Sequence, residues 1–123
     1  MNLLVPISIG ELVDKITILQ IKSERIQDAQ KLKNINHELG ELIHQFHRLK
    51  DCGIDSLVAD LKQINSELWD IEDFKRSCEK TQLFDDDFVY AARQVYLKND
   101  ERARIKKEIN LICGSNIVEE KSY

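Results

Sequence analysis

Two pairs of acidic residues have a spacing that could support metal chemistry. Glu38 and Glu41 are three residues apart, as are Glu67 and Asp70, and 25 residues separate the two pairs. Residues three apart share one face of a helix, and carboxylate oxygens are the ligands that Mg²⁺ prefers. If two facing helices carried these pairs, the four side chains could hold magnesium. The alternative is a solvated acidic surface neutralised by nearby lysines.

Seven polar and aromatic residues further along the chain could form a small anion pocket. Their arginines could grip a carboxylate or phosphate through paired N–H donors. The alternative is structural, because polar residues inside a helix interface fix register or oligomeric state. On that interpretation the two aromatic side chains belong to the core. The set is Asn65, Trp69, Glu72, Arg93, Tyr96, Asn99 and Arg102.

Hydrophobic periodicity predicts an all-α fold with four helices to position these residues. Ser8 and Glu11 form the capping box S-x-x-E at the start of the first helix, and Gly114 suits the end of the last. The expected helices cover residues 8–28, 31–50, 55 or 56 to beyond 71, and 85–113.

The second and third helices carry uninterrupted apolar seams spaced alternately three and four residues apart. A short connection at Gly53 would make these two helices antiparallel neighbours. The predicted architecture is therefore a four-helix antiparallel bundle, or elongated helical hairpins, with a coiled-coil-like spine of these two helices. The seams are Leu32, Ile35, Leu39, Leu42, Phe46 and Leu49, and Leu57, Leu61, Ile64, Leu68 and Ile71.

Placing this hairpin in register sets residue i level with about 106 − i, so Glu38 would face Glu67 and all four carboxylates would share one flank. The other flank, with Ile43, Val58 and Asn65, should receive the fourth helix. In the second hairpin i lies level with about 165 − i, which places Trp69 near Tyr96.

The carboxylate spacing resembles the metal motif of the MazG-like all-α nucleotide pyrophosphohydrolases, in which ExxE is followed by ExxD. That resemblance implies that Glu38, Glu41, Glu67 and Asp70 bind magnesium against a nucleoside triphosphate. His37 departs from the pattern, because the family usually has a further glutamate there.

A second resemblance covers nearly the whole chain. The segments SIGELVDKITIL (8–19), LWDIED (68–73), VYLKNDERARIKKEIN (95–110) and EEKSY (119–123) resemble an uncharacterised bacterial family whose domain has no known function. This resemblance implies a family without implying an activity.

Length and composition favour one helical domain spanning 1–123, with an extended N-terminal arm at 1–7 and a C-terminal tail at 115–123. A net charge of −4 argues against nucleic acid as the main partner. Eight acids against three bases in 67–87, and six bases against two acids in 93–107, should neutralise each other. No run approaches the length of a membrane span.

The three cysteines are Cys52, Cys78 and Cys113, with no C-x-x-C pair, so they are expected to be ordinary turn and core thiols. A reducing cytoplasm fits this pattern, and no leader is recognised.

Two functions remain open from the sequence. The first is a self-associating protein-interaction module, expected to be a dimer and to bind a partner protein, without catalysis or cofactor. Its apolar ends at Leu3–Ile7 and Ile117–Val118 should pack onto the first helix or onto a second copy. The alternative is a magnesium-dependent nucleoside triphosphate pyrophosphohydrolase that uses the four carboxylates.

Overall fold

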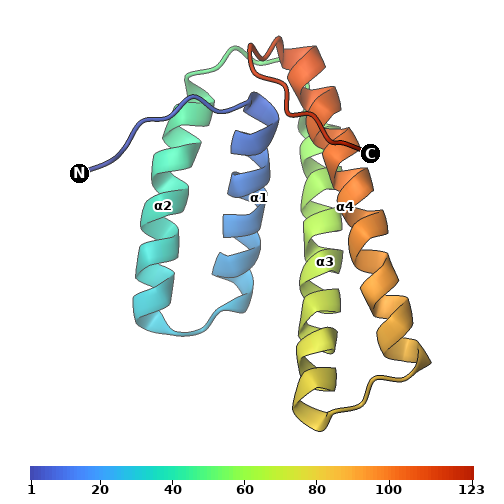
Figure 1. Ribbon diagram of the computed structural model, residues 1–123. Helices are drawn as coiled ribbons and strands as arrows, with labels where there is room; N and C mark the ends of the chain where they lie inside the picture. Colours follow the sequence, from blue (N-terminus) through green and yellow to red (C-terminus); the bar gives the residue numbers. More distant parts are fainter.

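The computed structural model describes all residues, 1–123, and contains four α-helices and no strand. They are α1 (Ile9–Arg25), α2 (Ala29–His47), α3 (Asp55–Thr81) and α4 (Asp86–Cys113). Figure 1 shows that successive helices run in opposite directions, so the chain forms two antiparallel hairpins, α1–α2 and α3–α4. The predicted all-α fold is confirmed.

Residues that favour helix ends set these boundaries. The Ser8 hydroxyl accepts a hydrogen bond from the Glu11 N–H, as the capping box predicts. Gly114 ends α4 with φ 67°, a left-handed conformation that glycine adopts without strain. α1 ends three residues earlier than expected, because Asp28 caps the following helix by accepting from the Lys31 N–H.

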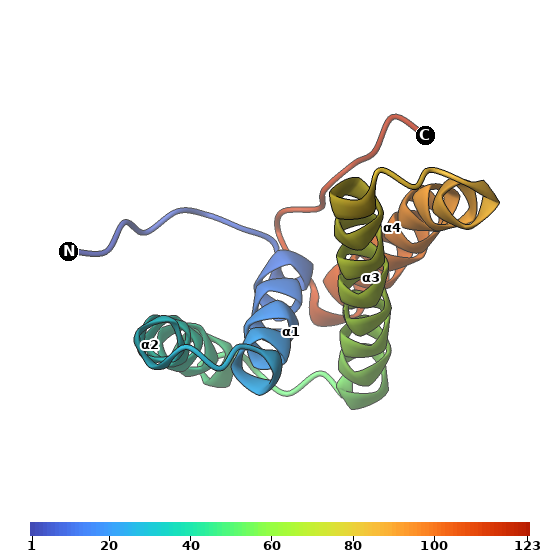
Figure 2. The ribbon, with the colours of Figure 1, turned by 90° about the horizontal axis from the view of Figure 1, so that it is seen from below.

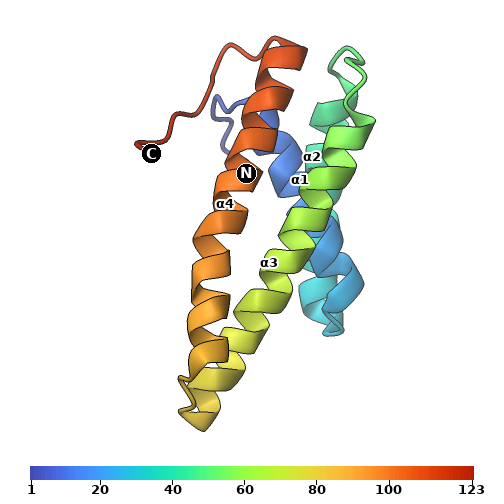
Figure 3. The ribbon, with the colours of Figure 1, turned by 90° about the vertical axis from the view of Figure 1, so that its right-hand side faces the viewer.

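α1 lies at the centre of the fold. It packs against each of the other three helices, α3 and α4 pack along each other, and α2 contacts α1 alone. Figure 2 shows this order in projection, with α1 between α2 and the α3–α4 pair. The far end of the α3–α4 hairpin projects beyond the turn between α1 and α2 (Figures 1 and 3).

The predicted spine of the second and third helices is wrong, because α2 and α3 do not touch. The residues of α1 explain why. α1 buries side chains around most of its circumference, including Leu12, Val13, Leu19 and Ile21, whereas α2 buries only Ile35. A helix that is apolar on several faces must occupy the centre, so the seam of α2 covers α1 instead of α3.

The predicted docking of the fourth helix is also wrong. α4 packs on the flank of α3 that carries Glu67, whose Oε2 lies 3.0 Å from Lys98 Nζ. Asn65, from the flank expected to receive α4, instead contacts Asp14 and Thr17 of α1. The predicted level of the two helices is nevertheless correct, since 67 and 98 sum to 165.

The main core lies between α1, α3 and α4, at the end of the molecule where α1 and α3 begin and α4 ends. Gly10 makes this close approach possible, because a Cβ there would lie 2.5 Å from the Lys106 carbonyl oxygen. The buried cluster consists of Val13, Ile54, Leu61, Ile64, Leu68, Ile105 and Ile109.

A disulfide joins Cys52 to Cys113, with their Cα atoms 5.5 Å apart. The expectation of three ordinary thiols is therefore wrong for this pair, while Cys78 is a buried free cysteine. The pairing could not be read from the sequence, because the two cysteines are 61 positions apart. The fold brings the α2–α3 loop and the end of α4 to the same end of the molecule (Figure 1).

The two chain ends behave differently. The N-terminal arm is extended and points away from the helices, with Leu3, Leu4 and Val5 exposed (Figure 2). The tail instead turns back along α4, where Glu119 and Glu120 pair with Lys106 and Lys107. None of the four helices is long and apolar enough to cross a bilayer.

Gly10→Ala should destabilise the fold by about 1–3 kcal/mol, because the added methyl overlaps backbone atoms of α4 that cannot move independently. Gly40→Ala is the matched control. A Cβ at Gly40 in α2 meets nothing within 4 Å, so alanine should stabilise by about 0.5–1 kcal/mol through helix propensity. Urea unfolding of both variants measures the difference, and equal effects would contradict the close approach.

Reduction of the disulfide should lower the free energy of unfolding by about 4 kcal/mol, the chain-entropy value for a loop of this length. Thermal melts with and without dithiothreitol test this. The Cys52→Ser/Cys113→Ser variant is the control, because reductant should leave its melting temperature unchanged. A wild-type melt that is insensitive to reductant would refute the bond.

Candidate functional site: a buried polar network

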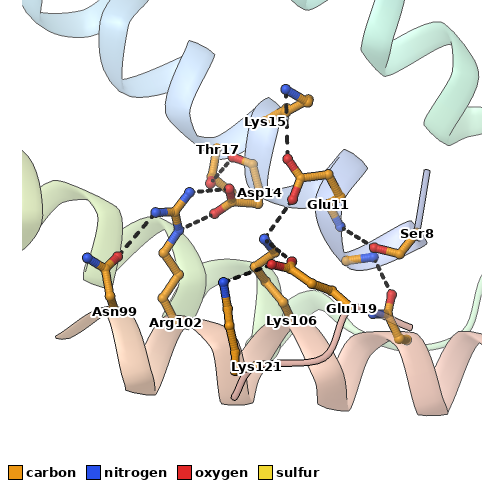
Figure 4. Close-up of polar contacts among 12 residues, drawn as sticks. Ser8, Glu11, Asp14, Lys15, Thr17, Asn99, Arg102, Lys106, Glu119 and Lys121 are labelled. Carbon is orange, nitrogen blue, oxygen red and sulfur yellow. Dashed lines mark hydrogen bonds and ion pairs between the residues drawn. The ribbon is translucent and has the colours of Figure 1, made fainter. Parts of the chain in front are cut away.

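The Asp14 carboxylate is the centre of a polar network between α1, α3 and α4. Asp14 is 1% exposed. Arg102 grips it with two hydrogen bonds, Nε to Oδ1 at 2.9 Å and Nη2 to Oδ2 at 2.5 Å (Figure 4). Asn65 Nδ2 adds a third at 2.9 Å. Both carboxylate oxygens are therefore occupied by donors.

Neighbouring groups complete this arrangement. The Thr17 hydroxyl accepts from Asn65 at 3.0 Å and donates to the Asp14 carbonyl at 2.8 Å. Asn99 Oδ1 accepts from Arg102 Nη1 at 3.3 Å. Hydrogen bonding to Asp14 raises the pKa of the Arg102 guanidinium above its ordinary value. The network thereby links side chains of all three helices.

A second group of ion pairs attaches the C-terminal tail to the same surface. Lys106 Nζ lies 2.6 Å from Glu11 Oε2 and 3.2 Å from Glu119 Oε2. Glu119 also pairs with Lys121 at 2.8 Å. Hydrogen bonds from Lys121 and then Lys106 hold the pKa of Glu119 below its ordinary value. Figure 4 shows Lys106 between the carboxylates of α1 and the tail.

Free backbone donors at the start of α1 receive partners from the far end of the chain. The Gly10 N–H donates to Asn110 Oδ1 at 2.6 Å, and the Ile9 N–H donates to Ser115 Oγ at 3.1 Å. The first N–H groups of a helix lack intrahelical acceptors. Side chains 100 and 106 positions away therefore accept these hydrogen bonds.

Sequence reasoning missed most of this network. It identified Asn65, Asn99 and Arg102 but assigned no role to Asp14 or Lys106. A signal was available, because Gly10, Asp14, Thr17 and Ile21 follow one another at intervals of four, three and four. Small and polar residues at core spacing on an apolar helix indicate a buried polar contact.

The predicted anion pocket is assembled only in part. Asn65, Trp69, Glu72 and Arg102 line a cleft of about 390 Å³ that is closed on one side by α1. Arg93 and Tyr96 do not line it, and Asn99 instead binds Arg102.

The aromatic members of that set are not core residues. Tyr96 is 53% exposed, whereas sequence reasoning expected it in the interior. Trp69 is half-buried, and the Arg25 guanidinium lies 5.8 Å from the centre of its ring. Trp69 and Tyr96 lie level with each other along the α3–α4 hairpin, as predicted. The neighbour of the Trp69 ring, however, is Arg25 of α1.

The four carboxylates of the predicted magnesium site do not come together. Glu38 and Glu41 are exposed on α2, which does not contact α3. Glu67 pairs with Lys98, which lowers the pKa of that carboxyl, and Asp70 pairs with Arg25. No three histidine, cysteine or acidic side chains cluster closely enough to hold a metal ion. The cause is again the insertion of α1, which invalidates the register.

The charged groups of the network bind one another and hold the helices together. The charged side chains of Asp14, Arg102, Glu11, Lys106 and Glu119 each have an opposite charge within hydrogen-bonding distance. A carboxylate that already accepts three hydrogen bonds has little capacity left for a further ligand. The arrangement fixes α1, α3, α4 and the tail relative to one another.

Asp14→Ala should cost about 3–5 kcal/mol of stability, because it leaves the guanidinium of Arg102 partly buried without its counter-charge. Glu101→Ala is the control. Its pair with Arg104 is exposed and 3.8 Å long, so its loss should change stability by less than about 0.5 kcal/mol. Guanidinium unfolding compares the two, and similar small changes would show that the network contributes little.

Comparison with known proteins assigns this chain to a family. No curated protein and no solved structure matches it. The sequence profile described as "Family of unknown function (DUF6165)" matches residues 3–123, in agreement with the resemblance of the four quoted segments, and nothing found relates the chain to the MazG-like enzymes. Three of those segments, 8–19, 95–110 and 119–123, contain residues of the polar network and of its ion pairs with the tail. They therefore share one structural role. The chain therefore belongs to the DUF6165 family of unknown function.

Proposed function

We propose that this chain is a helical interaction module that associates with copies of itself and performs no chemical step of its own. The observation that carries the proposal is a concentration of exposed apolar side chains on the projecting part of the α3–α4 hairpin. We call it the distal apolar surface. It comprises Phe74, Leu83, Phe84, Val89, Tyr90, Tyr96 and Leu97.

The fold explains why these side chains remain exposed. Only two helices are present over most of this surface, because α1 ends at Arg25, level with Trp69 and Asp70 of α3 (Figure 3). Two helices can bury one stripe each against the other, but they cannot also cover their outer faces. Soluble monomers rarely expose large contiguous apolar patches, and such patches mark interaction sites.

The N-terminal arm supplies a second apolar surface. Leu3 and Leu4 are more than four-fifths exposed, and no hydrogen bond or packing partner holds them. An extended segment of this kind gains most by packing against another molecule. Both apolar surfaces lie outside the locked core, so a partner can bind without disturbing it.

Two further observations support a role without catalysis. The charged side chains of the buried network are occupied by one another. The carboxylates required by the pyrophosphohydrolase alternative lie on helices that do not touch.

Self-association is tested by sedimentation equilibrium of the full chain over a hundredfold concentration range. We expect an average mass that rises from 14.4 kDa toward twice that value. Phe84→Ser/Val89→Ser should shift the equilibrium to monomer while helicity remains unchanged. Leu49→Ser, an exposed leucine at the opposite end, is the control and should leave the mass unchanged. A wild-type chain that remains at 14.4 kDa throughout would contradict the proposal.

A further inference from the structure

One row of exposed residues follows the face of α4 that points away from α1 and α3, and only its last two members have ion-pair partners within the chain. We call it the outward row. Its members follow at intervals of 4, 3, 4, 3, 4 and 3, and every one of them is exposed. They are Asp86, Tyr90, Arg93, Leu97, Asp100, Arg104 and Lys107.

The opposite face of α4 makes the buried contacts with α1 and α3. Ala91, Ile105 and Ile109 are buried there, while Lys98 and Arg102 pair with α3 and α1. The tail lies on a flank, where Glu120 is 3.4 Å from Lys107 Nζ. No other helix covers the outward row, and the tail reaches only its C-terminal part, where Asp100, Arg104 and Lys107 border a hollow shared with the tail.

We propose that the outward row binds the same row of a second copy, with the two α4 helices antiparallel about a two-fold axis at Leu97. This inference rests on the proposed self-association and extends its interface along α4, since the outward row shares Tyr90 and Leu97 with the distal apolar surface. The rise of an α-helix makes the row about 30 Å long from Asp86 to Lys107. Such a contact is isologous, so each residue and its partner occur twice.

The charges of the row are complementary in this orientation. With Leu97 level with its own copy, residue i lies level with about 194 − i. Arg93 then faces the partner copy's aspartate at position 100, and Asp86 faces the lysine at position 107. Tyr90 faces the arginine at position 104, a cation–π arrangement. Each charge on the row meets an opposite charge or an aromatic face.

The parallel orientation is unfavourable for the same residues. Each residue would then face its own copy, so Asp86, Arg93, Asp100 and Arg104 would each oppose a like charge. Like charges across an interface disfavour that arrangement. The sequence of charges along the row therefore selects one orientation.

Apolar residues gather at the centre of the proposed contact. Tyr96 lies next to Leu97 on the flank away from α3, and the antiparallel axis brings the same flanks together. The two residues are 53% and 45% exposed in the single chain. An apolar centre with charged pairs toward the ends is the usual anatomy of a protein interface.

Single charge reversals test the pairing. In Arg93→Glu and in Asp100→Lys, two attractive contacts become two repulsive ones, so the dissociation constant of the dimer should rise at least about tenfold. The double variant Arg93→Glu/Asp100→Lys restores opposite charges and should recover wild-type affinity. A mixture of the two single variants should also dimerise. Lys33→Glu, exposed on α2, is the control for a change in net charge.

Cross-linking tests the orientation. Protein with Tyr90→Cys mixed with protein carrying Arg104→Cys should be joined by a short bismaleimide, whereas Tyr90→Cys alone should not be. Self-linking of Tyr90→Cys would indicate parallel pairing and overturn the inference.

The outcomes separate this inference from the proposed function. A dimer that is unaffected by both charge reversals and gives no cross-link would refute the outward row and leave self-association standing. A chain that is monomeric at every concentration would refute both.

Discussion

A carboxylate removed from water must find donors for its oxygens, and the position of α1 follows from how Asp14 meets that requirement. Its two oxygens accept from Arg102 of α4 and Asn65 of α3. Those donors are correctly placed only when α1 lies between the two helices at one height. A buried ion pair adds little net stability compared with an apolar contact, but a misaligned one is costly. The pair therefore acts mainly by excluding other registers, and Gly10 permits the short interhelical distance that it needs.

The structure is consequently uneven along its length. One end combines the buried core, the polar network and the tail, which hold α1, α3 and α4 together, with the disulfide, which joins the α2–α3 loop to the end of α4. The far end is a bare pair of helices with apolar outer faces. Regions with few buried contacts open more readily than the core. A binding partner at the far end would supply the third layer that α1 supplies elsewhere, without any change in the locked end.

The sequence predicted local features well because local signals cause them. Ser8 and Gly114 cap helices through their own side chain and conformation, and hydrophobic spacing located all four helices. It failed on which helices touch. Heptad spacing on α2 and α3 is compatible with any apolar neighbour. A short loop between two helices favours contact between them but does not require it. The wrong pairing of α2 with α3 placed Glu38 and Glu41 beside Glu67, and it left the ion pair between Asp14 and Arg102 unpredicted. The disulfide was missed because its geometry exists only after the fold is known.

The basic tract of α4 shows how one helix can serve three partners. Its net positive charge suggested simple neutralisation by the acidic stretch of α3, but only Lys98 is used in that way, against Glu67. Helical periodicity turns Arg102 and Lys106 toward α1 and the tail. The same periodicity turns Arg93 and Arg104 outward, where they alternate with Asp86 and Asp100. Bases needed for the fold are thus matched by acids elsewhere in the chain, whereas the three outward bases share their row with two acids. Positions related by the two-fold axis carry opposite charges, as Asp86 and Lys107 or Arg93 and Asp100 do, so the row is complementary to its own copy, which distinguishes it from an ordinary solvated face.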